Sequence, residues 1–353
     1  MTTEQLTQEA IQLLCRLIET PRPSREEDEA ANLLWDFMTE KALKPQREKN
    51  NIWAIAPDYS SDRPTLLLNA HIDTVRPVNG WTRQPFCATR EGDTIYGLGS
   101  NDDGASLVCL LQVFRVLRNV PRSYNLVFLA SAEEEVSGKD GIERVLPLLP
   151  PIDVALVGEP TAMQPAIAEK GLMVIDAVAA GRAGHAARNE GDNAIYHALD
   201  DIQWIRTTQF PEQSPLLGPT KMTVTVVGGG TQHNVVPDRC TFVIDVRTNE
   251  LHTNKEIYDR LRQQLKSEIK ARSFRLSSSR ISDTHPLVQR AVALGRTPFG
   301  SPTLSDQALL RCPSMKMGPG DSSRSHTADE YIRISEISEA IDLYLALLRD
   351  LSL

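Results

Sequence analysis

Three apolar runs in this chain each lead into side chains that are good metal ligands. The runs and the side chains that follow them are Thr65–Ala70 with His71 and Asp73, Leu126–Ser131 with Glu133, Glu134 and Glu135, and Asp153–Gly158 with Glu159. Continuous apolar runs of this length predict strands that are buried on both faces, as in a parallel sheet. Open α/β sheets place their active sites outside the carboxyl ends of the strands. We therefore expect the three strands to direct imidazole and carboxylate groups at one place.

A fourth acidic segment lies between the first two runs. Asp102 and Asp103 directly precede a segment with the apolar spacing of a helix. Several carboxylates within a few ångström repel one another, so that some must be protonated unless a cation lies between them. A mixed set of imidazole and carboxylate groups suits zinc, with cobalt or manganese as possible substitutes. Each motif alone is compatible with an ordinary acidic loop, whereas the whole series favours a site for one or two divalent metal ions.

Composition and charge exclude several other classes of protein. The chain has 353 residues, enough for two domains, with 41% hydrophobic and 24% charged residues. It contains no apolar run of about 18 residues, and its first residues lack the features of a signal peptide. Five scattered cysteines without a CxxC pair indicate reduced thiols and a cytoplasmic protein. A net charge of −8 argues against binding to nucleic acid or to an anionic membrane surface.

The pattern of the chain changes at about residue 171. Before it, helices alternate with buried strands, which predicts a doubly wound α/β domain. From 172 to 278 the predicted strands alternate apolar and polar residues, as in an antiparallel sheet with one solvated face, and helical spacing covers 194–206 and 254–271. The prediction is a discontinuous catalytic domain, 1–171 and 279–353, with an inserted α+β domain at 172–278. Near the start of the chain, Ser24 and Glu27 have the spacing of a capping box, which predicts a helix through Met38.

The acidic motifs also carry a family resemblance. The series His-x-Asp, Asp-Asp-Gly, Glu-Glu, Gly-Glu-Pro-Thr and a late histidine, His326, resembles the M20 metallopeptidases, from about Leu13 to Tyr344. That family includes acetylornithine deacetylase, succinyl-diaminopimelate desuccinylase, carboxypeptidase G and aminoacylase. The chain is most similar to the acetylornithine and acetyl- or succinyl-citrulline deacetylases of arginine biosynthesis. It departs from the family pattern at Gly104, where a lysine is usual.

The resemblance implies a ligand set for two metal ions. His71 and Glu159 would hold one ion, Glu135 and His326 would hold the other, and Asp102 would bridge the two. Asp103 competes with Asp102 for the bridging role because the two acids are adjacent in the sequence. Asp73 lies two residues after His71 in an extended segment and points the same way, so we expect it to orient His71 rather than bind metal.

The three consecutive acids after the second run leave two registers open. One register makes Glu134 the general base and Glu135 a metal ligand. A shift by one residue gives these roles to Glu133 and Glu134 instead. An ordinary solvated turn is the structural alternative to both.

The inserted domain resembles the family's lid, which also mediates dimerisation. By that resemblance His185 reaches the site of a neighbouring subunit and stabilises the oxyanion. Asn234 and Gly229 contact the substrate, and Arg247 binds the substrate carboxylate, for which its guanidinium fork is well shaped. The structural alternatives are a hairpin turn, a glycine-rich loop and an arginine paired on the surface.

Together these features predict a zinc-dependent hydrolase, with two metal sites, that removes an acetyl or succinyl group from an amino acid such as ornithine or citrulline. The expected partners are a small N-acyl amino acid and a second copy of the chain in a homodimer. The alternatives are a di- or tripeptidase, or a succinyl-diaminopimelate desuccinylase, with the same site. A non-catalytic scaffold dimer and a metal-free binding protein are alternatives from other classes.

Overall fold

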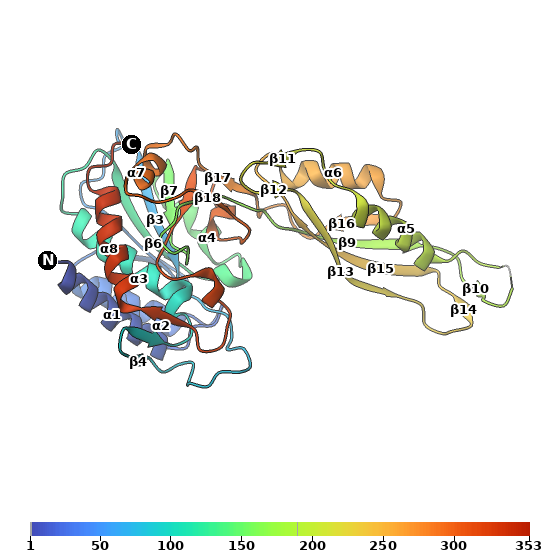
Figure 1. Ribbon diagram of the computed structural model, residues 1–353, viewed down its shortest axis with the longest axis horizontal. Helices are drawn as coiled ribbons and strands as arrows, with labels where there is room; N and C mark the ends of the chain where they lie inside the picture. Colours follow the sequence, from blue (N-terminus) through green and yellow to red (C-terminus); the bar gives the residue numbers. More distant parts are fainter. Residues whose placement is uncertain (1, 189) are drawn as a thin grey trace. The chain divides into compact units, whose positions relative to one another are not determined.

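The computed structural model describes residues 2–188 and 190–353, and these residues divide into two compact units (Figure 1). Unit 1 comprises the chain up to Ile167 together with Arg280–Phe299 and Ser305–Leu353. Unit 2 comprises Ala168–Ser279 and Gly300–Leu304. The predicted α/β class, with an inserted antiparallel sheet, is confirmed. The role of the insert as a lid and a dimerisation domain stays a prediction.

The main sheet is mixed rather than wholly parallel. Its strand order is β1 (Gln46–Glu48), β2 (Asn51–Ile55), β6 (Asn125–Ser131), β3 (Thr65–His71), β7 (Val154–Val157), β19 (Ser314–Lys316), β8 (Ala166–Glu169) and β17 (Ser279–Arg280), and β18 (Phe299–Ser301) also pairs with β8. Strands β6, β3, β7 and β19 run parallel, whereas β2 is antiparallel to β6 and β8 is antiparallel to β19. The three acidic motifs follow strands of the parallel part.

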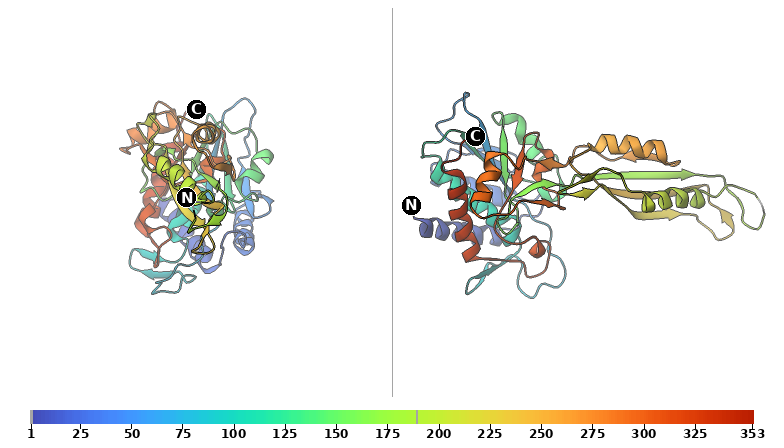
Figure 2. Two further views of the ribbon diagram at one scale, coloured as in Figure 1. Left: turned by 90° about the vertical axis from the view of Figure 1, so that its right-hand side faces the viewer. Right: turned by 45° about the horizontal axis from the view of Figure 1, so that its top comes forward.

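Helices cover both faces of this sheet. Helices α1 (Thr3–Glu19), α3 (Ala105–Leu117) and α8 (Ile334–Leu348) pack against one another on one side (Figures 1 and 2). On the other side, α4 (Ile142–Val145) closes a core that includes Trp53, Leu67 and Val127. The remaining elements of unit 1 are α2 (Asp28–Glu40), α7 (Pro286–Ala293) and a small sheet of β4 (Thr89–Glu91), β5 (Thr94–Tyr96) and β20 (Tyr331–Arg333). None of the described helices is long and apolar enough to cross a membrane.

Unit 2 is built on an antiparallel sheet with one solvated face, as the alternating pattern predicts. Its strand order is β13 (Lys221–Gly229), β15 (Arg239–Arg247), β9 (Met173–Ala180) and β16 (Glu268–Ala271). Every second residue of β9 is buried and packs in one cluster with α5 (Ala194–Thr207) and α6 (Asn254–Gln264). The short pairs β10 (Gly184–His185) with β14 (Val235–Val236) and β11 (Gln213–Ser214) with β12 (Gly218–Pro219) complete the unit.

Two local predictions are wrong. Ser24 and Glu27 form no capping box: α2 begins at Asp28, and the Ser24 Oγ donates instead to Asp73. The helix predicted over 254–271 ends at Gln264 and is followed by β16. The buried Asp201 carboxylate accepts the backbone N–H groups of Lys266 and Ser267, which stabilises the extended chain after the helix.

Candidate metal centre

The carboxyl ends of three neighbouring parallel strands bring the acidic motifs together. His71 is the last residue of β3 and lies opposite Ser131, the last residue of β6. Glu134 and Glu135 are in the short helical turn that follows β6, and Glu159 follows β7, which pairs with the other side of β3. This convergence follows from the parallel pairing β6-β3-β7, because parallel strands end at the same edge of a sheet.

Two overlapping groups of side chains have the spacing of metal ligands. In the first, one ligand atom each from His71, Glu134 and Glu159 lie within 4.8 Å of one another. In the second, ligand atoms of His71, Asp102 and Glu135 meet the same limit. The two groups share His71, so the structure brings four acids and one imidazole into one small volume.

Asp102 lies between two imidazoles. Its Oδ1 is 3.2 Å from Nε2 of His71, and its Oδ2 is 3.7 Å from Nε2 of His326. The same His326 nitrogen is 2.9 Å from Oε2 of Glu135. Ligand atoms on a tetrahedral zinc ion lie about 3.3 Å apart, given bonds of about 2.0–2.1 Å. The donor atoms present therefore fit a pair of metal ions that share the Asp102 carboxylate.

The two acids that compete for these roles lie outside both groups. Glu133 points toward Arg25, with 3.8 Å between its Oε2 and the Arg25 Nε. Asp103 is buried, and burial together with the nearby Asp102 raises its pKa to about 7. The geometry thus favours the register in which Glu134 and Glu135 face the metal site, and it favours Asp102 as the bridge.

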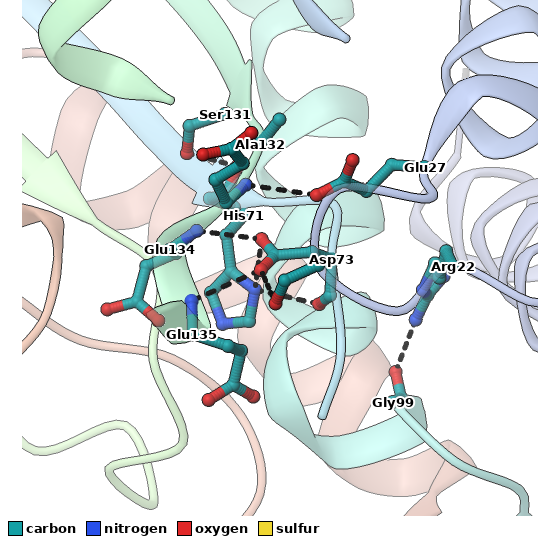
Figure 3. A network of polar contacts seen from close by, with 12 residues as sticks. Arg22, Glu27, His71, Asp73, Gly99, Ser131, Ala132, Glu134 and Glu135 are labelled. Atoms are coloured by element: carbon teal, nitrogen blue, oxygen red, sulfur yellow. Dashed lines mark hydrogen bonds and ion pairs between the residues drawn. The ribbon is translucent and has the colours of Figure 1, made fainter. Parts of the chain in front are cut away.

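Asp73 forms hydrogen bonds with His71 and with the turn that contains Glu134 and Glu135 (Figure 3). The Nδ1–H of His71 donates to the backbone carbonyl of Asp73 at 2.9 Å, which leaves Nε2 facing Asp102. The Asp73 carboxylate accepts the backbone N–H groups of Glu134 (3.0 Å) and Glu135 (3.1 Å). Asp73 therefore fixes the tautomer of one ligand and the backbone of the loop beside it.

Three buried polar residues around the site were not predicted from the sequence. Glu27 accepts the backbone N–H of Glu133 at 3.2 Å, and Arg22 donates to the carbonyl of Gly99 at 2.8 Å (Figure 3). Glu330 accepts three backbone N–H groups of the Asp102 loop. Spacing along the chain gives no signal for Arg22, which lies between two prolines. Glu330 lies four residues after His326, and only that proximity could have drawn attention to it.

The pKa shifts of the site residues indicate that a cation is needed to keep the buried carboxylates ionised together. Burial raises the pKa of Glu134 and of Glu159 well above the usual range, and neighbouring carboxylates add to the shift. Burial lowers the pKa of His71, but hydrogen bonds to Asp102 and Asp73 outweigh it and raise the value well above normal. The hydrogen bond to Glu135 raises the pKa of His326 to about 8. Divalent ions would allow all of these carboxylates to ionise together and both imidazoles to be neutral.

The predicted residues of the insert lie at two ends of unit 2. His185 lies opposite Val235 in the β10–β14 pair, and the carbonyl of Asn234 accepts the backbone N–H of Ala186. Gly229 pairs with Cys240 at the start of β15, whereas Arg247 ends that strand. Seven residues of strand correspond to about 23 Å. Unit 2 therefore does not bring Arg247 together with the other three residues.

Arg247 is paired with an acid of its own strand. Its Nε and one terminal nitrogen donate to the two carboxylate oxygens of Asp245, at 2.9 and 3.2 Å. About a third of the Arg247 side chain is exposed. A substrate carboxylate that binds this guanidinium would therefore compete with Asp245.

Several known proteins are similar to this chain in sequence. The sequence pattern that defines "Peptidase family M20/M25/M40" matches residues 67–350. A Mycobacterium tuberculosis protein provisionally named succinyl-diaminopimelate desuccinylase is 27% identical over 94% of this chain and 96% of its own length. Acetylornithine deacetylase from Pectobacterium carotovorum is 29% identical over 76% of this chain and 75% of its own. A Pyrobaculum aerophilum protein provisionally named LysW-lysine/LysW-ornithine hydrolase is 29% identical over 90% of both chains.

Solved structures share the fold at lower identity. A tripeptidase from Staphylococcus aureus superposes with a TM-score of 0.74 at 20% identity, over 97% of this chain and 98% of its own. A dinuclear metal binding peptidase of the M20 family from Bacillus subtilis gives a TM-score of 0.75 at 18% identity, over 98% of both chains. At these identities the likeness shows the fold alone.

Proposed function

We propose that this chain, which belongs to the peptidase family M20/M25/M40, is a two-metal hydrolase that removes an acetyl or succinyl group from the α-amino group of an amino acid. The amino acid would be one such as ornithine or citrulline, and the reaction would belong to arginine biosynthesis. The observation that carries the hydrolase proposal is the Asp102 carboxylate between His71 and His326. An acid that is shared by two imidazoles, with more carboxylates around it, is suited to a pair of divalent ions.

His71 and Glu159 would hold one ion, Glu135 and His326 the other, and Asp102 would bridge them. Zinc is the proposed metal, with cobalt or manganese as substitutes, because the donors are imidazole and carboxylate groups. Bound metal would polarise the carbonyl of the substrate amide and lower the pKa of a water molecule toward neutrality.

Glu134 is the proposed general base. Burial raises the pKa of its carboxyl group, which suits an acid that must accept a proton and release it again near neutral pH. Glu134 would take a proton from the attacking water as the new C–O bond forms. It would then give that proton to the nitrogen as the C–N bond breaks, so that the products are a free carboxylic acid and a free amine. Asp73, through its bonds to His71 and to the Glu134 backbone, would keep both groups in place.

The insert would supply the substrate contacts. His185 is the proposed donor to the oxyanion, and Asn234 and Gly229 would contact the substrate. Arg247 would bind the α-carboxylate in exchange for Asp245. Gly229 and Arg247 are about 23 Å apart along the β13–β15 ribbon, so these groups reach one substrate only if they come from two copies of the chain. This distance supports the proposal that His185 serves the site of a partner subunit.

The names of the relatives support a diamino acid as the substrate. They refer to ornithine, to lysine and to diaminopimelate, which all carry an amino group beyond the one at the α-carbon. A second candidate is therefore the hydrolysis of LysW-lysine or LysW-ornithine, favoured by the relative that matches 90% of both chains.

A substrate panel tests the reaction. Protein stripped of metal and reloaded with zinc or cobalt should release amine from N-acetyl- or N-succinyl-ornithine or -citrulline and leave dipeptides intact. Cleavage of dipeptides alone would retain the metal centre and make the protein a peptidase. No turnover of any amide by metal-loaded protein would overturn the hydrolase proposal.

A homodimer is the second expected outcome. Strand β13 is at the end of the strand order in unit 2, and its Val226 and Val227 are 58% and 61% exposed. A long apolar edge of this kind invites pairing with another strand. Sedimentation should give twice the chain mass of 39.2 kDa. A Val226→Lys/Val227→Lys variant should sediment as a folded monomer, whereas Glu268→Lys on the opposite edge strand, β16, should remain a dimer.

Mixing two inactive variants tests whether His185 acts on the partner subunit. His185→Ala and Glu134→Gln homodimers should each be nearly inactive. After subunit exchange, half of the dimers are mixed and each mixed dimer has one complete site, so about a quarter of the wild-type activity should return. Absence of recovery, with exchange verified by mass, would place His185 in its own subunit's site, whereas an active His185→Ala homodimer would place it outside the reaction.

A further inference from the structure

A buried carboxylate connects the segment that carries Asp102 with the segment that follows His326. Glu330 is only 2% exposed. Its Oε1 accepts the backbone N–H groups of Asn101 (2.8 Å) and Asp102 (2.9 Å), and its Oε2 accepts that of Gly99 (2.9 Å). The backbone carbonyl of Glu330 also accepts the N–H of Gly97 at 3.0 Å. One residue thus binds Asp102 and three residues of the loop before it, although it lies about 230 residues further along the chain.

The side chain of Asn101 makes the second connection. It is fully buried, and its Nδ2 donates to the carbonyl of Asp321 (3.1 Å) and to Oγ of Ser325 (3.3 Å). Its Oδ1 accepts the backbone N–H of Asp321 at 3.0 Å. A Cβ atom at Gly320 would collide with this amide, so glycine there permits the close approach. Asn101 therefore fixes the loop before His326 to the loop before Asp102.

The chemistry of Glu330 suits this task better than that of a neutral amide. Three N–H groups converge on it, and a carboxylate is a pure acceptor with about four lone-pair sites. A glutamine would turn an NH2 group toward at least one of these donors. Hydrogen bonds to a charged acceptor are also roughly twice as strong as neutral ones. Arg22, buried nearby and bonded to the carbonyl of Gly99, offsets part of the cost of a buried negative charge beside Asp102.

We propose that Glu330 and Asn101 act together as a clamp that holds Asp102 and His326 at the spacing a metal ion requires. Both are positioning residues, since neither faces the reacting atoms. The clamp orders two separate ligand-bearing loops before the metal arrives, so its free energy contributes to metal affinity rather than only to folding. The inference rests on metal binding, which is part of the proposed function, and it adds two residues that the ligand set does not contain.

Metal affinity measured by calorimetry tests the clamp. Protein stripped of metal is titrated with Zn²⁺ or Mn²⁺ alone, without substrate, and far-UV circular dichroism verifies the fold of each variant. Glu330→Gln should weaken binding about 10–100-fold, the usual effect of losing a group that orients metal ligands. Asn101→Ala should also weaken metal binding. This variant alone tests the proposal if Glu330→Gln does not fold.

Asp201 supplies the matched control. Its buried carboxylate also accepts two backbone N–H groups, those of Lys266 and Ser267, but in unit 2, in a loop without candidate metal ligands. Asp201→Asn should lower the melting temperature and leave metal affinity unchanged. Clamp variants that are folded and bind metal within about twofold of wild type would overturn the inference. Failure of the wild-type protein to bind metal would instead overturn the proposed function.

Discussion

Glu134→Gln should keep both metal ions and the fold and lose about 10²–10⁴-fold in kcat, the range expected when a general base is removed. Glu134 lies within 4.8 Å of His71 and Glu159, so it is close enough to be either a base or a ligand. The metal content of the variant separates these roles. Two ions per chain with little turnover identify a base, whereas the loss of an ion identifies a ligand. The measurement is therefore metal analysis alongside initial rates.

Glu133→Gln is the matched control, because Glu133 is the adjacent acid in the sequence and points toward Arg25. It should retain wild-type kcat within a few-fold. Full activity in Glu134→Gln together with loss of activity in Glu133→Gln would restore the alternative register and refute the proposed base.

Protein stripped of metal should lose stability as the pH rises from about 5 to 8, and reloading with metal should reverse the loss. Burial raises the pKa of Asp103 to about 7 and that of Asp306 to about 6, whereas the unfolded chain ionises aspartate near 3.9. Between these values the native state binds more protons than the unfolded state, so stability falls as pH rises. His326, with a pKa raised to about 8, contributes in the same direction between about 6.5 and 8.

Metal ions bind the deprotonated forms of their ligands, so the stabilisation by metal should increase over the same range. Calorimetric melting temperatures at pH 5, 6, 7 and 8, with and without zinc, give the comparison. Glu159→Gln should melt higher than wild type at pH 8 without metal, because it removes a buried carboxylate, and should gain much less from added zinc. A metal-induced shift that stays constant with pH would contradict the prediction.

The position of the candidate metal centre could be predicted from sequence because it depends on local patterns. Buried parallel strands are recognised by their continuous apolar runs, and the residues at the carboxyl ends of such strands lie at one edge of the sheet. His71 ends β3, and Glu135 and Glu159 come after β6 and β7. The neighbouring order β6-β3-β7, which brings these ends close together, comes from the structure.

The supporting residues could not be predicted, because their partners are distant in the sequence. Ser24 and Glu27 have the spacing of a capping box, yet Ser24 binds Asp73 and Glu27 binds the backbone of Glu133. A local pattern cannot show that a side chain has a stronger partner about 50 or 100 residues away. Glu330 likewise binds backbone N–H groups that are about 230 residues away in the sequence.

The error at the end of α6 has a different cause. Ile257, Leu261, Leu265 and Ile269 recur every four residues, which is a helical period, and all four are buried. The chain becomes extended after Gln264, and Ile269 reaches the same core from β16. The spacing of apolar residues indicates which side chains face the core. Here a helix followed by a strand produces the same spacing as one continuous helix.

The position of β19 in the main sheet bears on how the protein is made in the cell. β19 lies between β7 and β8, although it is synthesised about 150 residues after them, and His326 emerges later still. At about 5–20 residues per second, the ribosome needs on the order of ten seconds or more between Glu159 and His326. Unit 2, nearly continuous in sequence, can fold during that interval, whereas the ligand set stays incomplete. The proposed ligand set should therefore bind metal only after the chain has been synthesised as far as His326.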